Sequence, residues 1–541
     1  MMKKVMLSLI ALDFFLLYAK AEPFEVDGIW YEVTSDHTVM VVPEPTPQGS
    51  GTTFVFRNYY KGDIQIPQTV FFQEVYYSVT AAQEATFRES GELTSVSIPS
   101  TLTSLGTAPF AACPLLNTLS VESDNAAYAI ADGILYDKAM STLIACPATM
   151  TGIVSIPSSV TTIAPSAFRG CAYLSGIVVP QTVTEVGKRA FEGCKRVASL
   201  DLPNGIISIS DSTFYNCRDL KTISIPQTAL RIGVRAFYHC NNLASITIPD
   251  AVQTIDNFAF SLCYGLSSIQ LPVELRTIGQ RAFENCSNLS SLSIPAQVHE
   301  IGTLAFCGCS SLQSITVDET NSSFLSLDGV LFDKDMKTLL CCPSARQGDF
   351  IIPSSVCTIG EYGFYSCRYL KNVVLSPSLT NIQEGAFRLC TALRSVTLPS
   401  NVSSMGDNIF VACSALEKIV CYVPHPFDIN ASTFTSGNYN VPLYVLKRAL
   451  DDYKNAPYWS QFATILPIDG TVVDGLLGDV NNDGYINMSD VTVIINYILG
   501  REVNDFRWQQ ADMNFDGFIN MSDVTGVINF ILGNTTEDTE E

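Results

Sequence analysis

The chain has 541 residues, of which 47% are hydrophobic and 16% are charged. This balance is typical of a folded chain and argues against bulk disorder. The formal net charge of −22 disfavours nucleic acid as a partner, because phosphates are bound by basic surfaces. The acidic balance instead fits an exported protein, or a protein that uses carboxylates to bind metal.

Residues 1–21 are predicted to be an export signal. Lys3-Lys4 precede an apolar run over residues 5–18, which is too short to cross a bilayer comfortably. Residues 19–21 offer a small-x-small cleavage site, so we expect cleavage after Ala21, no membrane span in the mature chain, and a secreted or cell-surface protein. Asp13 is unfavourable inside the run, and the alternative is a retained membrane anchor.

A 23-residue period carries the hydrophobic pattern through residues 76–420. A unit of this length cannot bury its apolar side alone, so consecutive units must stack into a solenoid. In one copy, Ile269-Gln270-Leu271 predicts a strand with Gln270 pointing outward, and Pro272 ends that strand. Ala282-Phe283, Cys286 and Leu289 follow at three-residue steps, which predicts a short helical turn. A solenoid offers a long surface, so recognition is the first functional hypothesis.

The repeat pattern I-P-x-x-V-x-x-I-G-x-x-A-F-x-x-C-x-x-L, from Ile98-Pro99 to Leu416, resembles the BspA-like class of leucine-rich repeat found in bacterial surface proteins. The resemblance implies an α/β solenoid of 23-residue leucine-rich repeats, built from short parallel strands and short helical turns. It also implies a β-rich N-terminal cap over residues 22–75 and a C-terminal cap over residues 421–467. The expected function is adhesin-like binding of a host protein or glycan.

Cysteine recurs at one position of the repeat, which accounts for eleven of the 17 cysteines. Equivalent residues stack into an internal ladder, and free cysteine is among the most buried residue types. We therefore expect buried structural thiols; some disulfides or metal ligation are the alternatives. The eleven residues are Cys113, Cys171, Cys194, Cys217, Cys240, Cys263, Cys286, Cys309, Cys367, Cys390 and Cys413.

Two related islands, near residues 121–147 and 317–343, interrupt the period. Asp132-Gly133 in the first and Asp328-Gly329 in the second stand between apolar residues, a pattern that predicts β-hairpins. Each hairpin could simply extend the edge of a sheet, or it could contact a ligand.

The outward strand positions form the candidate recognition face. Small hydroxyl side chains dominate them and aromatic residues are few, which counts against sugar stacking. Such a face could dock an extended glycan or protein, but a merely soluble sheet would have the same composition. The positions are Ser97, Ser155, Val178, Asp201, Ser224, Thr247, Gln270, Ser293, Val374 and Thr397.

Two matching loops near the C-terminus predict a calcium site each. Oxygen donors stand at loop positions 1, 3, 5, 9 and 12, with glycine at position 6 and a backbone carbonyl available at position 7. Ca²⁺ takes six to eight hard oxygen ligands, so we expect two ions; a metal-free Asp/Asn-rich turn is the alternative. The candidate ligands are Asp479, Asn481, Asp483, Tyr485, Asn487 and Asp490 in the first loop and Asp512, Asn514, Asp516, Phe518, Asn520 and Asp523 in the second.

An amphipathic helix pattern follows each loop, from Val491 to Leu499 and from Val524 to Leu532. Tandem loop-helix units with aspartate at position 12 resemble a type I dockerin, here a small all-α calcium-binding domain over residues 478–533. Residues 468–477 are the expected linker and residues 534–541 an acidic tail.

The dockerin resemblance implies docking to a cohesin-like protein. In that family the partner contacts include loop positions 10 and 11, which are Met488, Ser489, Met521 and Ser522 in this chain. The methionines depart from the small hydroxyl pairs common in cellulosomal dockerins. Calcium could alternatively serve only the stability of a small domain.

No catalytic residues are predicted, and we expect a protein that is not an enzyme. The four histidines are scattered, and none is accompanied by a nucleophilic serine motif. An alternative function is a non-catalytic, dockerin-borne subunit of a polysaccharide-degrading assembly. A glycoside hydrolase is a third hypothesis, disfavoured because no separate catalytic domain fits.

Overall fold

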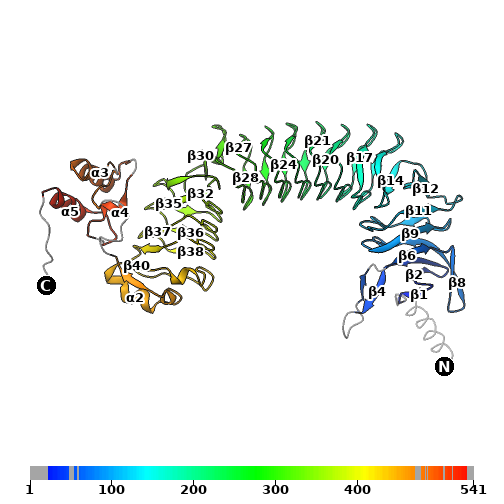
Figure 1. The fold of residues 1–541 in the computed structure, drawn as a ribbon, viewed down its shortest axis with the longest axis horizontal. Coiled ribbons are helices and arrows are strands. Elements are labelled where there is room, and N and C mark those ends of the chain that lie inside the picture. The colour runs from blue at the N-terminus through cyan, green and yellow to red at the C-terminus, as the bar shows by residue number, and fades with distance from the viewer. Residues whose placement is uncertain are drawn as a thin grey trace, which may run out of the picture. The chain divides into compact units, whose positions relative to one another are not determined.

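The computed structural model describes residues 22–47, 54–57, 60–468, 477–481, 483, 485–503, 506–514 and 516–532. They divide into two compact units, one up to Leu266 and one from Ser267 onward. Figure 1 labels their strands and helices. The predicted export signal, the acidic tail and most of the predicted linker lie outside the described residues.

The first unit begins with a β-rich segment whose apolar side chains alternate along the strands. Ile29 and Tyr31 of one strand pack with Val39 and Val41 of the next, all of them buried. This pairing is antiparallel, whereas β8 pairs with β3 in parallel. The strands are β1 (Phe24–Val26), β2 (Ile29–Ser35), β3 (Thr38–Val42), β4 (Glu44–Pro47), β5 (Phe54–Arg57), β6 (Lys61–Gln65), β7 (Thr69–Phe72) and β8 (Val75–Ala82).

Each regular coil of the first unit contributes two short strands to two parallel ladders. In one coil, β21 (Thr222–Ser224) buries Ile223, and β22 (Arg231–Ile232) buries Ile232. The turn between these strands is closed by the amide of Ala229, which donates to Pro226 O at 3.0 Å. The other strands of the unit are β9 (Glu92–Ile98), β10 (Ser104–Leu105), β11 (Thr118–Val121), β12 (Tyr128–Ala131), β13 (Ile134–Asp137), β14 (Thr142–Ala145), β15 (Gly152–Ser155), β16 (Thr162–Ile163), β17 (Leu174–Val178), β18 (Glu185–Val186), β19 (Ser199–Asp201), β20 (Ser208–Ile209), β23 (Ser245–Thr247) and β24 (Thr254–Ile255).

The predicted helical stretch of the repeat is a series of separate turns. Cys240 N donates to Phe237 O at 3.2 Å, and Leu243 N donates to Cys240 O at 3.2 Å. Arg235 and His239 have positive φ values of 55° and 62°, which stop a right-handed helix after one turn. The predicted solenoid class is confirmed, but the described repeats contain no helix, and the second short strand of each coil was not predicted.

Two ladders of identical side chains fill the core of the coils. In the first unit, the rings of Phe214 and Phe237 stack with centroids 5.2 Å apart. The cysteines lie beside them, buried and unbonded to one another. The Cys240 thiol donates to Phe214 O in the preceding coil at 3.1 Å. Each buried thiol of this kind therefore joins neighbouring coils, and the prediction of free structural thiols agrees with the structure.

Each island folds into three antiparallel strands that sit between coils. In the first, β12 pairs with β13, and β13 pairs with β14, which then pairs in parallel with β16 of the next coil. Asn125 is fully buried at the entrance, where its Nδ2 donates to Pro99 O at 2.7 Å and to Leu102 O at 3.0 Å. Asn321 makes the equivalent pair of bonds in the second island. One buried amide thus fixes each island to the preceding coil.

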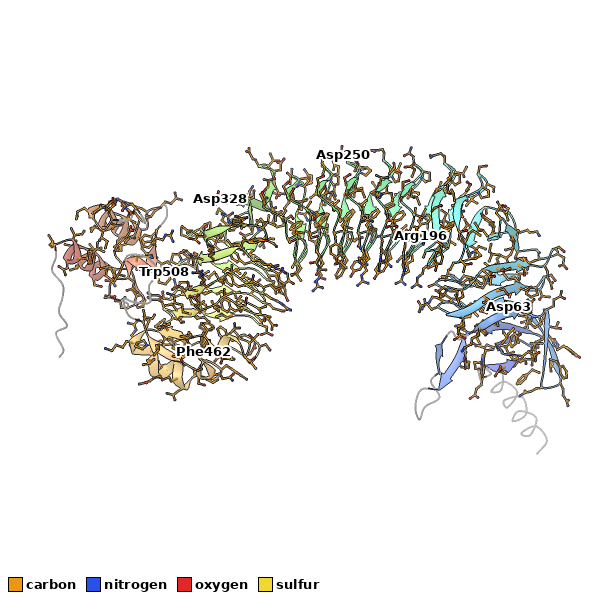
Figure 2. The ribbon with its side chains drawn as sticks, viewed as in Figure 1. Asp63, Arg196, Asp250, Asp328, Phe462 and Trp508 are labelled. Carbon is orange, nitrogen blue, oxygen red and sulfur yellow. The ribbon has the colours of Figure 1, made fainter. Side chains whose placement is uncertain are left out.

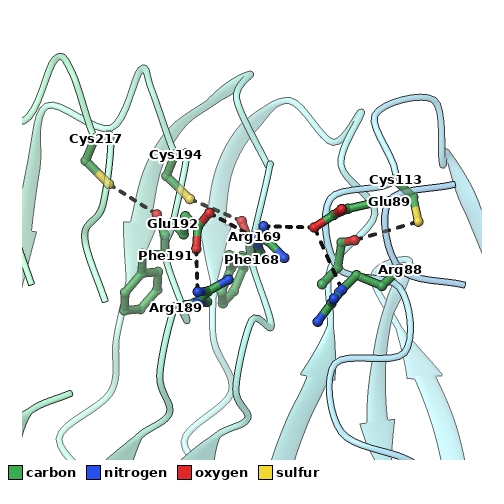
Figure 3. A network of polar contacts seen from close by, with 11 residues as sticks. Arg88, Glu89, Cys113, Phe168, Arg169, Arg189, Phe191, Glu192, Cys194 and Cys217 are labelled. Carbon is green, nitrogen blue, oxygen red and sulfur yellow. Dashed lines mark hydrogen bonds and ion pairs between the residues drawn. The ribbon is translucent and has the colours of Figure 1, made fainter. Parts of the chain in front are cut away.

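An ion-pair network crosses the first island (Figure 3). Arg169, in the coil that follows the island, places Nη2 3.2 Å from Glu89 Oε1 and Nε 3.1 Å from Glu192 Oε1. Arg189 approaches the other oxygen of Glu192 at 3.7 Å, and Arg88 lies 3.8 Å from Glu89. Arg169 is only 12% exposed, so it is the central cation of the network.

The second unit repeats this architecture, and its solenoid ends in the C-terminal cap. Trp459 and Tyr453 are fully buried in that cap, and the ring of Phe462 stacks on that of Trp459. Its helical elements are α2 (Leu450–Asn455) and the 3-10 helices η1 (Asn438–Asn440), η2 (Lys447–Ala449) and η3 (Trp459–Gln461). The strands of the unit are β25 (Ser268–Gln270), β26 (Thr277–Ile278), β27 (Ser291–Ile294), β28 (Glu300–Ile301), β29 (Ser314–Val317), β30 (Phe324–Leu327), β31 (Val330–Asp333), β32 (Thr338–Cys341), β33 (Gly348–Ile351), β34 (Thr358–Ile359), β35 (Leu370–Val374), β36 (Asn381–Ile382), β37 (Ser395–Leu398), β38 (Ser404–Met405), β39 (Lys418–Cys421), β40 (Leu443–Val445) and β41 (Ile465–Pro467).

Candidate calcium-binding module

A small helical module ends the described chain. It consists of α3 (Met488–Ile498), α4 (Trp508–Ala511) and α5 (Met521–Ile531). α3 and α5 lie against each other, and their facing apolar residues form a core of their own. Gly500, with a φ of +67°, follows the end of α3. The buried members of this core are Val480, Val491, Ile494, Ala511, Val524 and Val527.

The first predicted loop closes on itself through carboxylates and amides. Asp479 Oδ1 accepts from Asp483 N at 3.1 Å, and Asp483 Oδ1 accepts from Tyr485 N at 2.9 Å. Asp490, at loop position 12, reaches back to the start of the loop, where its Oδ1 accepts from Val480 N at 2.8 Å. Its Oδ2 accepts from Asn487 N at 2.9 Å, which caps α3. The structure thus brings the predicted ligand residues of this loop together.

The second loop repeats these contacts almost bond for bond. Asp512 Oδ1 accepts from Asp516 N at 3.1 Å, and its Oδ2 accepts from Gly517 N at 2.9 Å. Asp523 Oδ1 accepts from Met513 N at 2.9 Å, while its Oδ2 caps α5 by accepting from Asn520 N at 2.9 Å. The two loops therefore share one hydrogen-bond geometry.

The buried charge of the second loop fits a divalent cation. Asp512 and Asp523 are both fully buried. Burial, together with the charges of Asp523 and Asp516, raises the pKa of Asp512 to about 7 despite the amides that donate to it. A bound cation would relieve that repulsion. No three His, Cys, Asp or Glu side chains converge on a metal position anywhere in the described chain, so asparagine oxygens and backbone carbonyls must complete the set.

The residues predicted to meet a partner are exposed at the start of both helices. Met488 and Met521 are each 59% exposed, although both are apolar. Ser489 and Ser522 beside them are exposed as well. Each serine Oγ also accepts from the asparagine at loop position 3, Asn481 or Asn514, at 2.8 Å. The Met-Ser pairs therefore form matching exposed patches that are tied to their loops.

The candidate recognition face lies on the solenoid strands, away from these loops in sequence. In the first unit, a depression of about 310 Å³ on this face is lined by Asp201, Thr222, Ser224, Gln227 and Thr247 together with neighbouring residues. Most of the predicted outward positions are exposed, as expected. The prediction was wrong for Val374, which is only 9% exposed.

Aromatic residues gather on the turns that carry the cysteines, where no functional residue was predicted. The rings of Tyr215 and Tyr238 stack with centroids 4.9 Å apart. His239 meets Tyr238 and Tyr264 edge-on, at 6.3 Å and 6.2 Å. The signal was available, because these residues stand one or two places from a ladder cysteine in successive repeats.

Trp508 is a second residue whose place was not predicted. It is 4% exposed and packs with the buried residues of the C-terminal cap (Figure 2). It stands four positions before the second loop, whereas glycine occupies the same place before the first. That asymmetry between two otherwise matching halves could have identified it.

None of the helices in the described ranges is both long and apolar enough to cross a membrane. The comparison with curated proteins gives no match. Among solved structures, a leucine-rich repeat protein from Eubacterium ventriosum is 25% identical, with a TM-score of 0.43 over 50% of this chain and 73% of that one. A leucine-rich repeat protein from Bacteroides ovatus is 23% identical, with a TM-score of 0.42 over 82% of this chain and 100% of that one.

Two family models match the chain. The model for the BspA type leucine rich repeat region matches residues 68–155, 145–244, 230–328 and 341–440. The model for the dockerin type I domain, a calcium-binding module, matches residues 477–532. Both are families of binding modules without catalytic machinery, so the chain has a binding and docking role. The protein belongs to the BspA-type leucine-rich repeat family and carries a type I dockerin at its C-terminal end.

Proposed function

We propose that this protein is an exported, surface-associated or secreted adhesin-like protein that docks to a cohesin-like partner through a dockerin holding two calcium ions. The observation that carries the proposal is the pair of matching loops, each with an exposed Met-Ser pair at positions 10 and 11. Met488 and Met521 occupy equivalent positions of the two loops, and each is 59% exposed.

The calcium ligands of the proposal are the twelve residues predicted from the loop spacing. Asp479, Asn481, Asp483, Asn487 and Asp490 supply side-chain oxygens in the first loop, and Tyr485 supplies its backbone carbonyl. In the second loop the side-chain oxygens come from Asp512, Asn514, Asp516, Asn520 and Asp523, and the carbonyl from Phe518. Bound calcium would neutralise the clustered carboxylates and fix the starts of α3 and α5 in space.

Calorimetric titration of the full chain with Ca²⁺ tests the ligand assignment. We expect two ions per chain, one ion for Asp479→Ala or Asp512→Ala, and none for the double variant. The double variant should also lose the circular-dichroism signal of α3 and α5 while the β signal persists. Unchanged stoichiometry in the double variant would reject the assigned sites.

Partner docking is tested separately with an immobilised cohesin domain as the probe. The full chain should bind with calcium and be released by a chelator. Met488→Asp combined with Met521→Asp should abolish binding while two ions still bind, because a buried charge at an apolar contact has no compensating partner. Binding that survives this change would place the partner surface elsewhere.

The strand face of the solenoid supports a second binding activity, for a glycan or a host protein. The depression around Ser224 and Thr247 offers hydroxyl groups and the Asp201 carboxylate within one shallow hollow. Arrays of glycans and matrix proteins would test the full chain. Ser224→Trp with Thr247→Trp should fill the hollow and abolish any binding found there, whereas Thr228→Trp on the adjacent turn should not.

An alternative function is that of a non-catalytic subunit of a polysaccharide-degrading assembly. Only the dockerin supports this alternative. It predicts that the cohesin partner belongs to a scaffold that also carries glycosidases. Mass-spectrometric identification of the proteins that co-purify with the partner would distinguish this role from adhesion.

A further inference from the structure

The second calcium loop lies against the C-terminal cap of the solenoid. Arg448, in η2 of the cap, donates from Nη2 to the backbone oxygen of Asp516 at 2.7 Å. The same guanidinium lies 5.6 Å from the ring centroid of Phe518, within reach of a cation–π contact. Loop positions 5 and 7 are therefore both in contact with one residue of the cap.

Position 6 of this loop is just as closely packed. Gly517 has a φ of +80°, and a Cβ built on it would lie 3.1 Å from Tyr422 O and 3.4 Å from a methyl of Leu446. A side chain would be strained there by its backbone and crowded by its neighbours. Gly517 thus allows the turn of the calcium loop, and it also allows the backbone of the cap to approach that loop closely.

An aromatic contact extends the same interface. Trp508 meets Tyr422 edge-to-face at a centroid distance of 4.8 Å. Phe506 packs against the core of the cap and also stacks on Tyr497 of α3 at 4.1 Å. The Trp508 Nε1 and the Tyr422 hydroxyl are buried without a hydrogen-bond partner among the described residues, so apolar packing must outweigh the cost of burying them.

The first loop supplies the internal comparison. Tyr485 occupies the position of Phe518 and is 73% exposed, against 54% for Phe518. The hydrogen bonds that Asn481 and Asp483 make in the described part of this loop stay within the dockerin. The two calcium loops have similar geometry but different surroundings. The second loop contacts the C-terminal cap, whereas these hydrogen bonds of the first loop stay within the dockerin.

We propose that the second calcium loop is an intramolecular docking surface that closes the end of the solenoid, so that calcium at this loop stabilises the C-terminal cap. The inference rests on the calcium ligands proposed above. Its contact uses loop positions 5, 6 and 7 and leaves Met521 and Ser522 exposed. Closure of the solenoid and docking to a partner are therefore compatible.

Calcium binding at the second loop and opening of the cap should be thermodynamically linked. If the cap must release the second loop in order to open, and calcium binds that loop more tightly while it is docked, calcium lowers the equilibrium population of the open cap by the ratio of the two affinities. At a free calcium concentration of about 100 times the dissociation constant, amide exchange in the cap should slow by up to roughly 100-fold.

Hydrogen–deuterium exchange of the full chain, with calcium and with a chelator, tests the effect. We expect calcium to protect α2 and β40 of the cap, and Asp512→Ala to abolish that protection while Asp479→Ala retains it. Arg448→Ala with Trp508→Leu should also abolish it, although calorimetry still finds two ions. Lys447→Ala, an exposed neighbour of Arg448, is the control and should behave as wild type.

The possible failures are distinct. If calorimetry finds no calcium in the wild type, the proposed ligands fail. If two ions bind but the exchange of α2 and β40 is the same with calcium and with chelator, the docking inference is overturned. It is overturned as well if Asp479→Ala and Asp512→Ala affect the cap equally, since the inference requires the second loop alone.

Discussion

The thiol of Cys240 donates a hydrogen bond to the backbone oxygen of Phe214, one coil earlier, at 3.1 Å. Equivalent bonds from Cys217 to Phe191 and from Cys263 to Phe237 make this a repeated element of the structure. The carbonyl also receives the amide of its own coil, as in Cys217 N to Phe214 O at 3.2 Å. The Phe214 carbonyl oxygen therefore accepts two hydrogen bonds, one from an amide of its own coil and one from the thiol of the next coil.

We predict that the ladder thiols of the native protein resist alkylation at pH 8. Burial raises the pKa of Cys217 and of Cys263 to about 12, so almost no thiolate forms, and both side chains are shielded from solvent. Cys357, which is partly exposed, should react first. Mass spectrometry after a short iodoacetamide pulse would show this, with urea-unfolded protein as the control in which all 17 cysteines react.

The same burial predicts alkaline sensitivity. A thiol whose pKa is raised in the folded state contributes stability below its unfolded pKa, near 9, and loses it as the pH rises toward about 12. Each such thiol should lower the free energy of unfolding by up to about 1.4 kcal/mol per pH unit in that window. Urea unfolding at pH 8, 9.5 and 10.5 would measure the slope. Cys217→Ala should reduce it, and an unchanged slope would count against this source.

Arg169 should be essential to the packing across the first island. Arg169→Met removes the shared cation of Glu89 and Glu192, and we expect a loss of about 1–3 kcal/mol because Glu192 is largely buried. Arg88→Met is the matched control. Its partner distance is 3.8 Å and its side chain is 45% exposed, so its effect should stay below about 0.5 kcal/mol. Equal shifts in the urea midpoint of both variants would contradict this prediction.

Asn125 should be among the most sensitive polar positions of the chain. Its Nδ2 makes two bonds to the preceding coil, and its Oδ1 accepts from Ala127 N and Tyr128 N, both at 2.8 Å. Asn125→Ala should cost about 2–4 kcal/mol, and Asn125→Asp more, because the new charge would face two carbonyl oxygens. Asp124→Ala, at an exposed neighbour, should be nearly neutral. Thermal unfolding of the three variants would rank them.

The metal-free dockerin should weaken as the pH rises from about 4 to 7. The pKa of Asp512 is raised from 3.8 to about 7 by burial and by neighbouring carboxylates. Its contribution to stability is therefore present below pH 3.8 and lost as the pH rises through 7. In chelator, the helical signal of α3 and α5 should melt at a lower temperature at pH 7.5 than at pH 4.5. Saturating calcium should remove the difference at pH 7.5, and a higher metal-free melting point at pH 7.5 would refute the assignment.

The coil and its core could be predicted because every inward position recurs at 23 residues, as at Phe214 and Phe237. The short strands such as β22 could not be predicted. A strand of two residues is too short to show an alternation of apolar and polar side chains, and its pairing depends on the next coil. The candidate calcium ligands could be predicted because their spacing is local, within a single loop of the sequence. The contact of Trp508 with Tyr422 joins residues 86 positions apart without any repeat, so no local pattern could indicate it.

A chain of nearly identical units has a characteristic hazard, since a coil can pair with the wrong neighbour at little cost in energy. The two islands make the coils around them distinguishable from the other coils. Asn125 and Asn321 each join an island to two carbonyl oxygens of the coil before it, so each island is a landmark that the regular coils lack. We therefore expect these interruptions to act as register marks during folding, because they break the 23-residue repetition at two defined points.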